Sequence, residues 1–250
     1  MSEKKPQIWG HRGHKGRLPE NTLCSFRSAL EAGADGVELD VQKTSDGEFV
    51  VIHDGCVERT TNGQGRVNDL TLDDLQSFDA GGGERIPSLQ SVLTLVATYE
   101  GKTVDVELKG ETLSKDDFAA LDSLLSQYPQ IHFHMSSFMH ELLEPFSSAG
   151  YEVGLLLGED HQKAGFGALV KTIRTIQPAY LNLPIQVFDS LPAIILRMLL
   201  FLARWKGIKI AFWTVNTQDQ WRKVRSFAQV LITDHSPQMI QWEQSISSRT

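Results

Sequence analysis

Cysteine is scarce in this chain of 250 residues, which contains only Cys24 and Cys56 and no CxxC motif. Two isolated thiols are typical of a reducing compartment, and a disulfide scaffold is therefore excluded. The first residues, 1–6, include lysines but no apolar run behind them, so we expect no secretory signal peptide. Together these features predict a cytoplasmic protein.

Positive charge is also in short supply, with 24 Lys and Arg against 31 Asp and Glu, a formal net charge of −7. Proteins that bind nucleic acid usually present a basic face or an aromatic-lined basic groove, so we expect no nucleic-acid partner. A small anionic substrate remains compatible with this charge, because local cations and a metal ion can outweigh the global balance.

No hydrophobic run is long enough to cross a membrane. The most apolar stretch, Ile194 to Ala203, contains Arg197 and is followed by Arg204 and Lys206. It is far shorter than the ~20 residues that span a bilayer. We expect it to form the buried face of a helix rather than a membrane-surface helix, and we expect no stable membrane anchor.

What the sequence does contain is a series of short, β-rich, mostly apolar runs with helical patterns between most of them. Strands buried on both faces have this composition. The runs are Gln7–Gly10, Gly36–Gln42, Thr103–Leu108, Ile131–Met135, Glu152–Leu157, Ala179–Leu183, Ile208–Thr214 and Val230–Thr233. Eight strand–helix units in 250 residues predict a single-domain (β/α)₈ TIM barrel over residues 1–250. A doubly wound open sheet is the alternative, disfavoured because no GxGxxG turn follows the first run.

One interval, between the second and third runs, is too long for a simple strand–helix unit. It begins with a short additional strand at Phe49–Asp54 and ends with a helical pattern at Ser88–Tyr99. Between them, Gly55 to Ile86 is polar and rich in glycine. Long loops in compact domains are usually functional, so we expect residues 55–86 to be a capping insertion over the barrel mouth.

Charged residues interrupt the apolar runs where a parallel barrel gathers its catalytic groups, at the carboxyl ends of strands. Glu38 and Asp40 are two residues apart, and so are Glu107 and Lys109, so each pair projects from one face of its strand. Acids pointing inward are costly to bury without a compensating cation. Three carboxylates without cysteine predict a hard ion, Mg²⁺ or Ca²⁺.

Each of these groups alone also has a structural interpretation. The Glu38/Asp40 pair would suit a partly exposed strand edge, and Glu107/Lys109 would suit a structural ion pair. His11, at the end of the first run, and His53, after the additional strand, would suit satisfied structural histidines. Their combination at several strand ends is the more specific signal. Elsewhere, Glu20 and Asn21 are expected to fix a loop before a helix capped by Thr22.

A set of ordered motifs resembles the glycerophosphodiester phosphodiesterase family, in its cytosolic bacterial form. The resemblance extends from Ile8 to about Pro237. It rests on His11-Arg12-Gly13, Pro19-Glu20-Asn21-Thr22, Gly36-Val37-Glu38-Leu39-Asp40, His53-Asp54, Arg59-Thr60-Thr61-Asn62-Gly63, Ile86-Pro87-Ser88-Leu89, Glu107-Leu108-Lys109, Ser136-Ser137-Phe138, Trp213-Thr214-Val215-Asn216 and Thr233-Asp234. Any one of these motifs alone is weak, but their common order is specific.

The resemblance implies a TIM barrel that hydrolyses glycerophosphodiesters, a small-molecule substrate class, to glycerol 3-phosphate and an alcohol. It implies that Glu38, Asp40 and Glu107 bind the metal and that His11 and His53 act as general acid and base. It further implies that Arg12 and Lys109 contact the phosphate. Trp213 is expected either to pack against the glycerol or to fill the upper core.

Several alternatives remain open at this level. The nucleophile is either water or the substrate's own glycerol 2-hydroxyl, and either histidine can be the acid. The sequence does not identify the leaving alcohol, choose between Mg²⁺ and Ca²⁺ or give the oligomeric state. The alternative function is a lysophospholipase D-type phosphodiesterase that acts on longer-chain substrates. A catalytically silent barrel would be expected to lack part of the acid, base and cation set, whereas all of it is present here.

Overall fold

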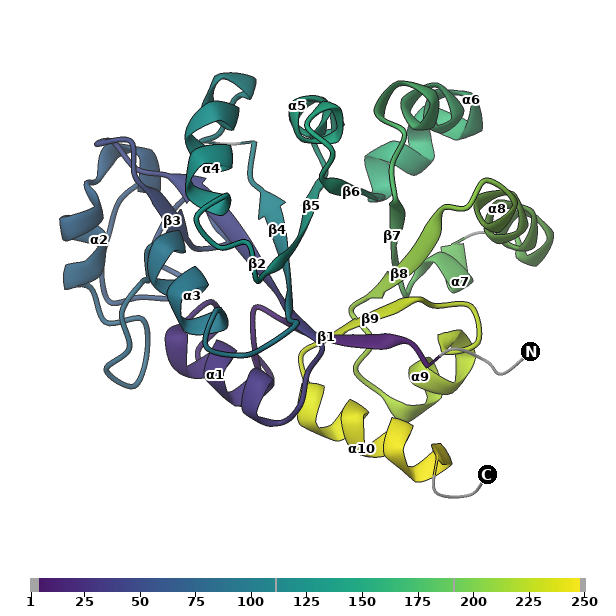
Figure 1. The fold of residues 1–250 in the computed structure, drawn as a ribbon, viewed down its shortest axis with the longest axis horizontal. Coiled ribbons are helices and arrows are strands. Elements are labelled where there is room, and N and C mark those ends of the chain that lie inside the picture. The colour runs from purple at the N-terminus through teal and green to yellow at the C-terminus, as the bar shows by residue number, and fades with distance from the viewer. Residues whose placement is uncertain (1–4, 111, 191, 248–250) are drawn as a thin grey trace.

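The computed structural model describes residues 5–110, 112–190 and 192–247, and its centre is a closed barrel of eight parallel strands (Figure 1). These strands are β1 (Gln7–His11), β2 (Gly36–Lys43), β4 (Thr103–Leu108), β5 (His132–Ser137), β6 (Glu152–Leu156), β7 (Tyr180–Pro184), β8 (Lys209–Trp213) and β9 (Val230–Thr233). Each pairs with its neighbour in chain order, and β1 closes the barrel by pairing with both β2 and β9. The predicted TIM barrel is therefore confirmed.

Helices surround the barrel, as Figure 1 shows. They are α1 (Leu23–Glu31), α2 (Leu72–Ser77), α3 (Leu89–Val96), α4 (Phe118–Leu125), α5 (Glu144–Ser148), α6 (Glu159–Ile176), α7 (Val187–Ser190), α8 (Ala193–Trp205), α9 (Gln218–Val224) and α10 (Ser236–Ser247). Four of these helices begin with hydroxyl caps: Thr22, Thr71, Ser88 and Thr217 each accept a bond from a backbone N–H in the first turn. Such caps satisfy amide groups that the helix itself leaves unpaired.

The strands bury both of their faces. Alternate residues such as Ile8, Leu181 and Leu231 join the main core between strands and helices. The intervening residues form a separate cluster inside the barrel, composed of Trp9, Tyr180, Ala211, Val230 and Ile232. Because side chains alternate across a strand, this split explains why the strand sequences are apolar at nearly every position.

Residues 55–86 form a small unit beside the barrel with a core of its own. Strand β3 (Phe49–Val51) leads into it, pairing antiparallel to the end of β2. Two residues before the unit, Val50 of β3 and Ile52, join its cluster, whose other members are Val57, Val67, Leu75, Ala80 and Ile86. In Figure 1 this unit lies at the periphery around α2.

Helix α8 is only partly the buried helix face that its composition predicts. Leu196, Leu199, Leu200 and Ala203 are buried, as expected. Ile194, Ile195 and Met198 are exposed, so the expectation is wrong for the other face of the helix. No helix in the described ranges is both long enough and apolar enough to span a membrane.

Candidate active site

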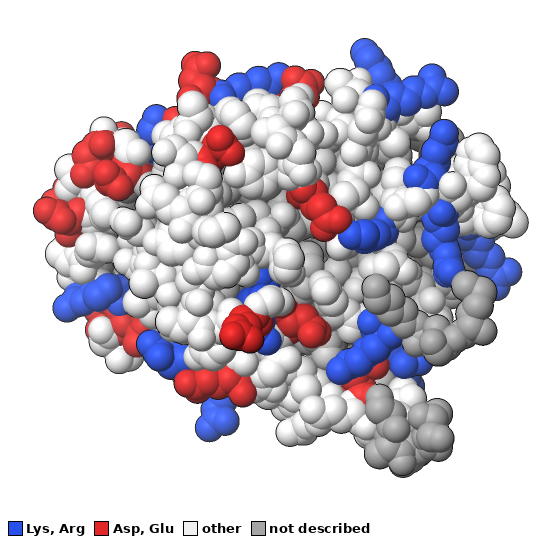
Figure 2. Space-filling model, in the orientation of Figure 1, with Lys and Arg blue, Asp and Glu red and all other residues white. Residues whose placement is uncertain are grey.

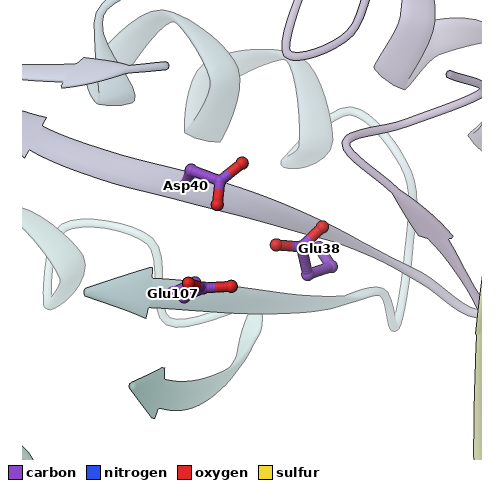
Figure 3. Close-up of side chains that lie close together, drawn as sticks. All are labelled: Glu38, Asp40 and Glu107. Atoms are coloured by element: carbon purple, nitrogen blue, oxygen red, sulfur yellow. The ribbon is translucent and has the colours of Figure 1, made fainter. Parts of the chain in front are cut away.

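Three buried acids of the neighbouring strands β2 and β4 lie close together (Figure 3). Glu38 and Asp40 lie two residues apart on β2, and Asp40 is in register with Glu107 on β4. Parallel pairing therefore places all three side chains on the same side of neighbouring strands. One carboxylate oxygen from each lies within 4.8 Å of the others. The set predicted from the sequence is thus brought together.

Two cations and one amide hold these acids. The Lys109 ammonium lies 2.9 Å from Asp40 Oδ1 and 2.5 Å from Glu107 Oε1. The Arg12 guanidinium lies 3.2 Å from Asp40 Oδ2, and its backbone N–H donates to Glu38 Oε2 at 2.9 Å. Asn21 donates to Asp40 Oδ2 at 2.8 Å, so its side chain does more than fix the preceding loop.

Burial and the repulsion between neighbouring carboxylates disfavour the ionised form of Glu38 and Glu107. Burial raises the pKa of Glu38 well above its usual range, and the nearby carboxylates of Asp40 and Glu107 raise it further. Burial also raises the pKa of Glu107 to about 7, although Lys109 opposes the shift. Burial likewise disfavours the Asp40 carboxylate, but Lys109 and Arg12 outweigh it and hold that pKa below its usual range. A further positive charge would stabilise the ionised form of Glu38 and Glu107.

The acids fit a hard divalent cation. Glu38 Oε1 is buried and has no hydrogen-bond partner among the described residues, which is costly for a carboxylate oxygen. The donor set consists of carboxylate oxygens alone, the ligands that Mg²⁺ and Ca²⁺ prefer. The cluster therefore could hold such an ion, with the unpartnered Glu38 oxygen as one ligand.

His11 ends β1 beside this cluster. Its Nδ1 is 2.6 Å from Asp234 Oδ1, and its Nε2 is 3.9 Å from Glu38 Oε2. Asp234 is fixed in turn, because Asn216 donates to its Oδ2 at 2.6 Å and accepts from its backbone N–H at 2.9 Å. The imidazole consequently presents Nε2 to the acids. Burial lowers the pKa of His11, although Asp234 opposes this shift, which favours a neutral ring.

His53 follows β3 and has the same kind of support. Its Nδ1 is 2.5 Å from Asp54 Oδ1, and Asp54 is held by the Arg59 guanidinium. Arg59 also donates to Glu20 Oε1 at 2.7 Å, and Arg12 donates to the same oxygen at 2.8 Å. Burial lowers the pKa of His53, partly offset by Asp40. Arg59 thereby connects residues 55–86 to both the histidine and the arginine of the site.

Trp213 lies at the end of β8, which is far from β2 and β4 in the strand order around the barrel. Its indole N–H donates to the Asn182 carbonyl oxygen at 3.1 Å, and Phe138 packs edge-on against its ring at 5.7 Å between centroids. The peptide bond from Trp213 to Thr214 is cis. Trp213 and Phe138 therefore form an apolar wall, with Trp213 at the end of β8 and Phe138 directly after β5.

Sequence reasoning missed the roles of Asp234 and Asn216, which support His11. Both belong to quoted motifs, but nothing near them in the sequence identifies their partner, which is 223 residues from Asp234. An acid directly after the last strand of a barrel is the one signal that was available, since that strand adjoins the first.

Comparison with known proteins agrees with this geometry. The model of the glycerophosphoryl diester phosphodiesterase family matches residues 11–237. A glycerophosphodiester phosphodiesterase of Caldanaerobacter subterraneus is 32% identical over 94% of this chain and 97% of its own length. A crystal structure of such an enzyme from Thermotoga maritima has a TM-score of 0.83 and 29% identity, covering 96% of this chain and 99% of that one.

One further structure is informative about the ligand. A phosphodiesterase of Oleispira antarctica was solved in complex with its product sn-glycerol 3-phosphate. It has a TM-score of 0.81 and 26% identity, covering 96% of this chain and 97% of that one. The barrel and its site define the present chain as a (β/α)₈-barrel hydrolase. It belongs to the glycerophosphoryl diester phosphodiesterase family.

Proposed function

We propose that this chain hydrolyses glycerophosphodiesters to glycerol 3-phosphate and an alcohol with the help of Mg²⁺ or Ca²⁺. The observation that carries the proposal is the acid cluster of Glu38, Asp40 and Glu107, flanked by two histidines that are each held by a carboxylate. The product seen in the Oleispira protein supports the same substrate class. The free cysteines Cys24 and Cys56 suit the cytoplasmic location that we also propose.

The charges of the cluster suit a phosphodiester monoanion. Three carboxylates with Arg12 and Lys109 carry a formal charge of −3 + 2 = −1. A bound divalent ion would change this to +1, which the single negative charge of the substrate would balance. When bound, the ion supplies Lewis-acid stabilisation of charge on phosphoryl oxygens. Arg12 and Lys109 lie against the acids, and we assign to them contacts with the phosphate and the placement of Asp40.

The two histidines are suited to the two proton transfers. A carboxylate on Nδ1 favours the proton there, which leaves Nε2 of His11 and of His53 free to exchange a proton with the reacting groups. Lowered pKa values keep both rings neutral before substrate binds. The phosphodiester anion then raises the pKa of the nearer histidine and favours its action as the acid, while the other acts as base.

The apolar wall supports a role in orienting the substrate. We propose that Trp213, which packs against Phe138, also packs against the glycerol. We also propose that residues 55–86 cap the site within the single domain, because Arg59 ties them to Asp54 and Glu20.

A substrate panel tests the proposed function. Glycerol 3-phosphate release is measured with glycerophosphocholine, -ethanolamine, -glycerol and -inositol. Lysophosphatidylcholine is the longer-chain comparison, and because its products are lysophosphatidic acid and choline, choline release is measured for it and for glycerophosphocholine. We expect turnover of one or more glycerophosphodiesters and much lower turnover of the lysophospholipid. Preference for lysophosphatidylcholine would favour the lysophospholipase D-type alternative, and no release from any diester would refute both.

The histidine roles have a separate test. His11→Ala and His53→Ala should each lower kcat on glycerophosphocholine by about 10²- to 10⁴-fold, the usual contribution of general acid–base catalysis. The matched control is His132→Ala, at the exposed start of β5 on the opposite end of the barrel. Near-wild-type turnover by either variant of His11 or His53 would show that the two-histidine scheme is wrong.

A further inference from the structure

Helix α8 presents a stripe of large apolar side chains to solvent. Within the described residues, five of the eight exposed large hydrophobic side chains belong to this helix: Ile194, Ile195, Met198, Phe201 and Trp205. Four of them recur at spacings of four, three and four residues, with exposures of 67%, 57%, 69% and 70%. This spacing places them along one line, opposite the buried Leu196, Leu199, Leu200 and Ala203.

Cations border this stripe on both sides. At 100° per residue, Arg197 and Arg204 fall on one flank and Lys206 on the other. Lys171 and Arg174 add positive charge from the neighbouring helix α6. Within the part of the chain that is described, no ion pair involves Arg174, Arg197 or Arg204, and the sequence has no acid between Asp189 and Asp219. In Figure 2, Lys and Arg gather on the side where Figure 1 places α6 and α8.

An apolar groove adjoins the stripe, between α6 and α8. It has a volume of about 540 Å³ and is lined by Val170, Ile173, Leu199 and Leu202 together with the charged Arg174 and Lys206. The Lys206 ammonium lies 5.0 Å from the centroid of the Trp205 ring. Hydrocarbon-lined space beside cations matches a phospholipid, which combines acyl chains with an anionic headgroup.

We propose that this α8 face, defined by the five exposed apolar residues and the bordering cations, binds the surface of an anionic phospholipid membrane. A helix with an apolar stripe and basic flanks lies in the membrane interface, with its apolar side chains among the acyl chains and its cations at the headgroups. The positive charge is local to this face of a chain whose net charge is −7. A second copy of the same face would bring like charges together, so self-association is disfavoured.

Flotation with lipid vesicles tests the proposal and needs no catalytic activity. Vesicles of phosphatidylcholine alone are compared with vesicles containing about 30% phosphatidylglycerol, at low and at high salt. We expect the chain to float with the anionic vesicles at low salt, to dissociate as salt rises, and to remain unbound with the neutral vesicles.

Surface variants locate the binding face. Phe201→Ser/Trp205→Ser should lower the partition coefficient more than about tenfold, because two interfacial side chains are lost. Arg197→Gln/Arg204→Gln should lower it by roughly 10- to 30-fold. The matched controls are Phe227→Ser, whose side chain is 38% exposed, and Lys115→Gln/Arg222→Gln on other helices. The controls should bind as wild type does, and all of these variants should retain glycerophosphocholine hydrolysis without vesicles.

Three outcomes would overturn the proposal. One is a chain that does not float with anionic vesicles at low salt. Another is Phe201→Ser/Trp205→Ser binding as strongly as Phe227→Ser. The last is a wild-type dimer in sedimentation velocity that Phe201→Ser/Trp205→Ser converts to monomer, which would identify the α8 face as a contact between copies of the chain.

Discussion

At the scale of single residues, the site pairs each histidine with a carboxylate that lies away from the acid cluster. Asp234 holds His11 and Asp54 holds His53, in both cases through Nδ1. The two carboxylates are themselves fixed, one by Asn216 and the other by Arg59. This arrangement sets the tautomer and the orientation of each ring before a substrate arrives.

Replacing Asp234 tests that support. In Asp234→Asn, the oxygen of the new amide still accepts a hydrogen bond from Asn216. The NH₂ group of the new amide then faces His11, and because it can only donate, Nδ1 of His11 must act as the acceptor. The proton then moves to Nε2, the nitrogen required for base catalysis. We expect kcat to fall by roughly 10²-fold or more while KM changes little. Steady-state kinetics with glycerophosphocholine over pH 5–9 measures this effect.

The control is Asp122→Asn, which removes a carboxylate that accepts from Tyr151 outside the barrel mouth. It should leave kcat and the pH profile unchanged. An Asp234→Asn enzyme with wild-type kcat would show that His11 needs no such support.

The ionisation of Glu20 makes the stability of the folded chain depend on pH. Burial disfavours its charge, but hydrogen bonds from Arg59 and Arg12 outweigh burial and lower its pKa from 4.5 to about 2. A carboxylate with a lowered pKa stabilises the fold above its unfolded pKa, and this stabilisation is lost as pH falls from about 4.5 to about 2. Glu20→Gln should therefore lower the free energy of unfolding by up to about 3 kcal/mol at pH 7 and by much less near pH 2.

Urea unfolding across this pH range measures the difference. Glu31→Gln, at the exposed end of α1, is the control and should give the wild-type pH profile. A stability loss in Glu20→Gln that is the same at pH 7 and near pH 2 would contradict the assignment of the pKa shift to ionised Glu20.

Whether a site residue could be predicted from the sequence depends on how far along the chain its contact partners lie. Glu38, Asp40 and Lys109 were predictable because i, i+2 spacing on a strand fixes their common face. The bond between His11 and Asp234 was not, because it exists only when the last strand closes against the first. Asn21 was read as a loop residue for the same reason, since its contact with Asp40 depends on the packing of the first loop over β2.

At the scale of elements, α8 shows how composition misleads when periodicity is ignored. Its run of apolar residues predicts a buried helix face, yet the structure buries only one side of the helix and leaves apolar residues exposed on another. Counting positions at 100° separates the buried residues from the exposed stripe. The sequence alone does not reveal which of two apolar sides faces the barrel, because that depends on the packing of α6 and α8.

The unit formed by residues 55–86 has its own hydrophobic cluster, so we expect it to unfold locally while the barrel stays folded. Leu75 is fully buried in that cluster and lies on α2. Leu75→Ala should lower the free energy of unfolding of this unit by about 2–5 kcal/mol. Amide exchange measured by mass spectrometry should then rise within residues 55–86 while the strands of the barrel keep their protection.

Leu181→Ala on β7 is the matched control, since Leu181 is equally buried but belongs to the main core. It should raise exchange across the barrel by lowering global stability. If Leu75→Ala instead raised exchange in the barrel strands to the same extent as in residues 55–86, the unit would not be energetically separate.

At the scale of the whole molecule, barrel closure assembles the site from both ends of the chain. His11 lies on the first strand and Asp234 directly after the last, and β1 joins them by pairing with β9. The eight strands were predictable from their apolar runs: two match the observed bounds at both ends, and the ends of the others differ by at most two residues. The placement of residues 55–86 over the mouth stays a prediction, and the contact of Arg59 with Glu20 supports it.

The central claim is that the acid cluster holds the divalent ion required for phosphodiester hydrolysis. Its most direct test is glycerol 3-phosphate release from glycerophosphocholine by enzyme stripped with EDTA and then supplied with Mg²⁺ or Ca²⁺. We predict loss of activity on chelation and recovery with at least one ion, and no recovery in Glu38→Gln, which lacks the unpartnered carboxylate oxygen. Full activity in the presence of EDTA would contradict the account.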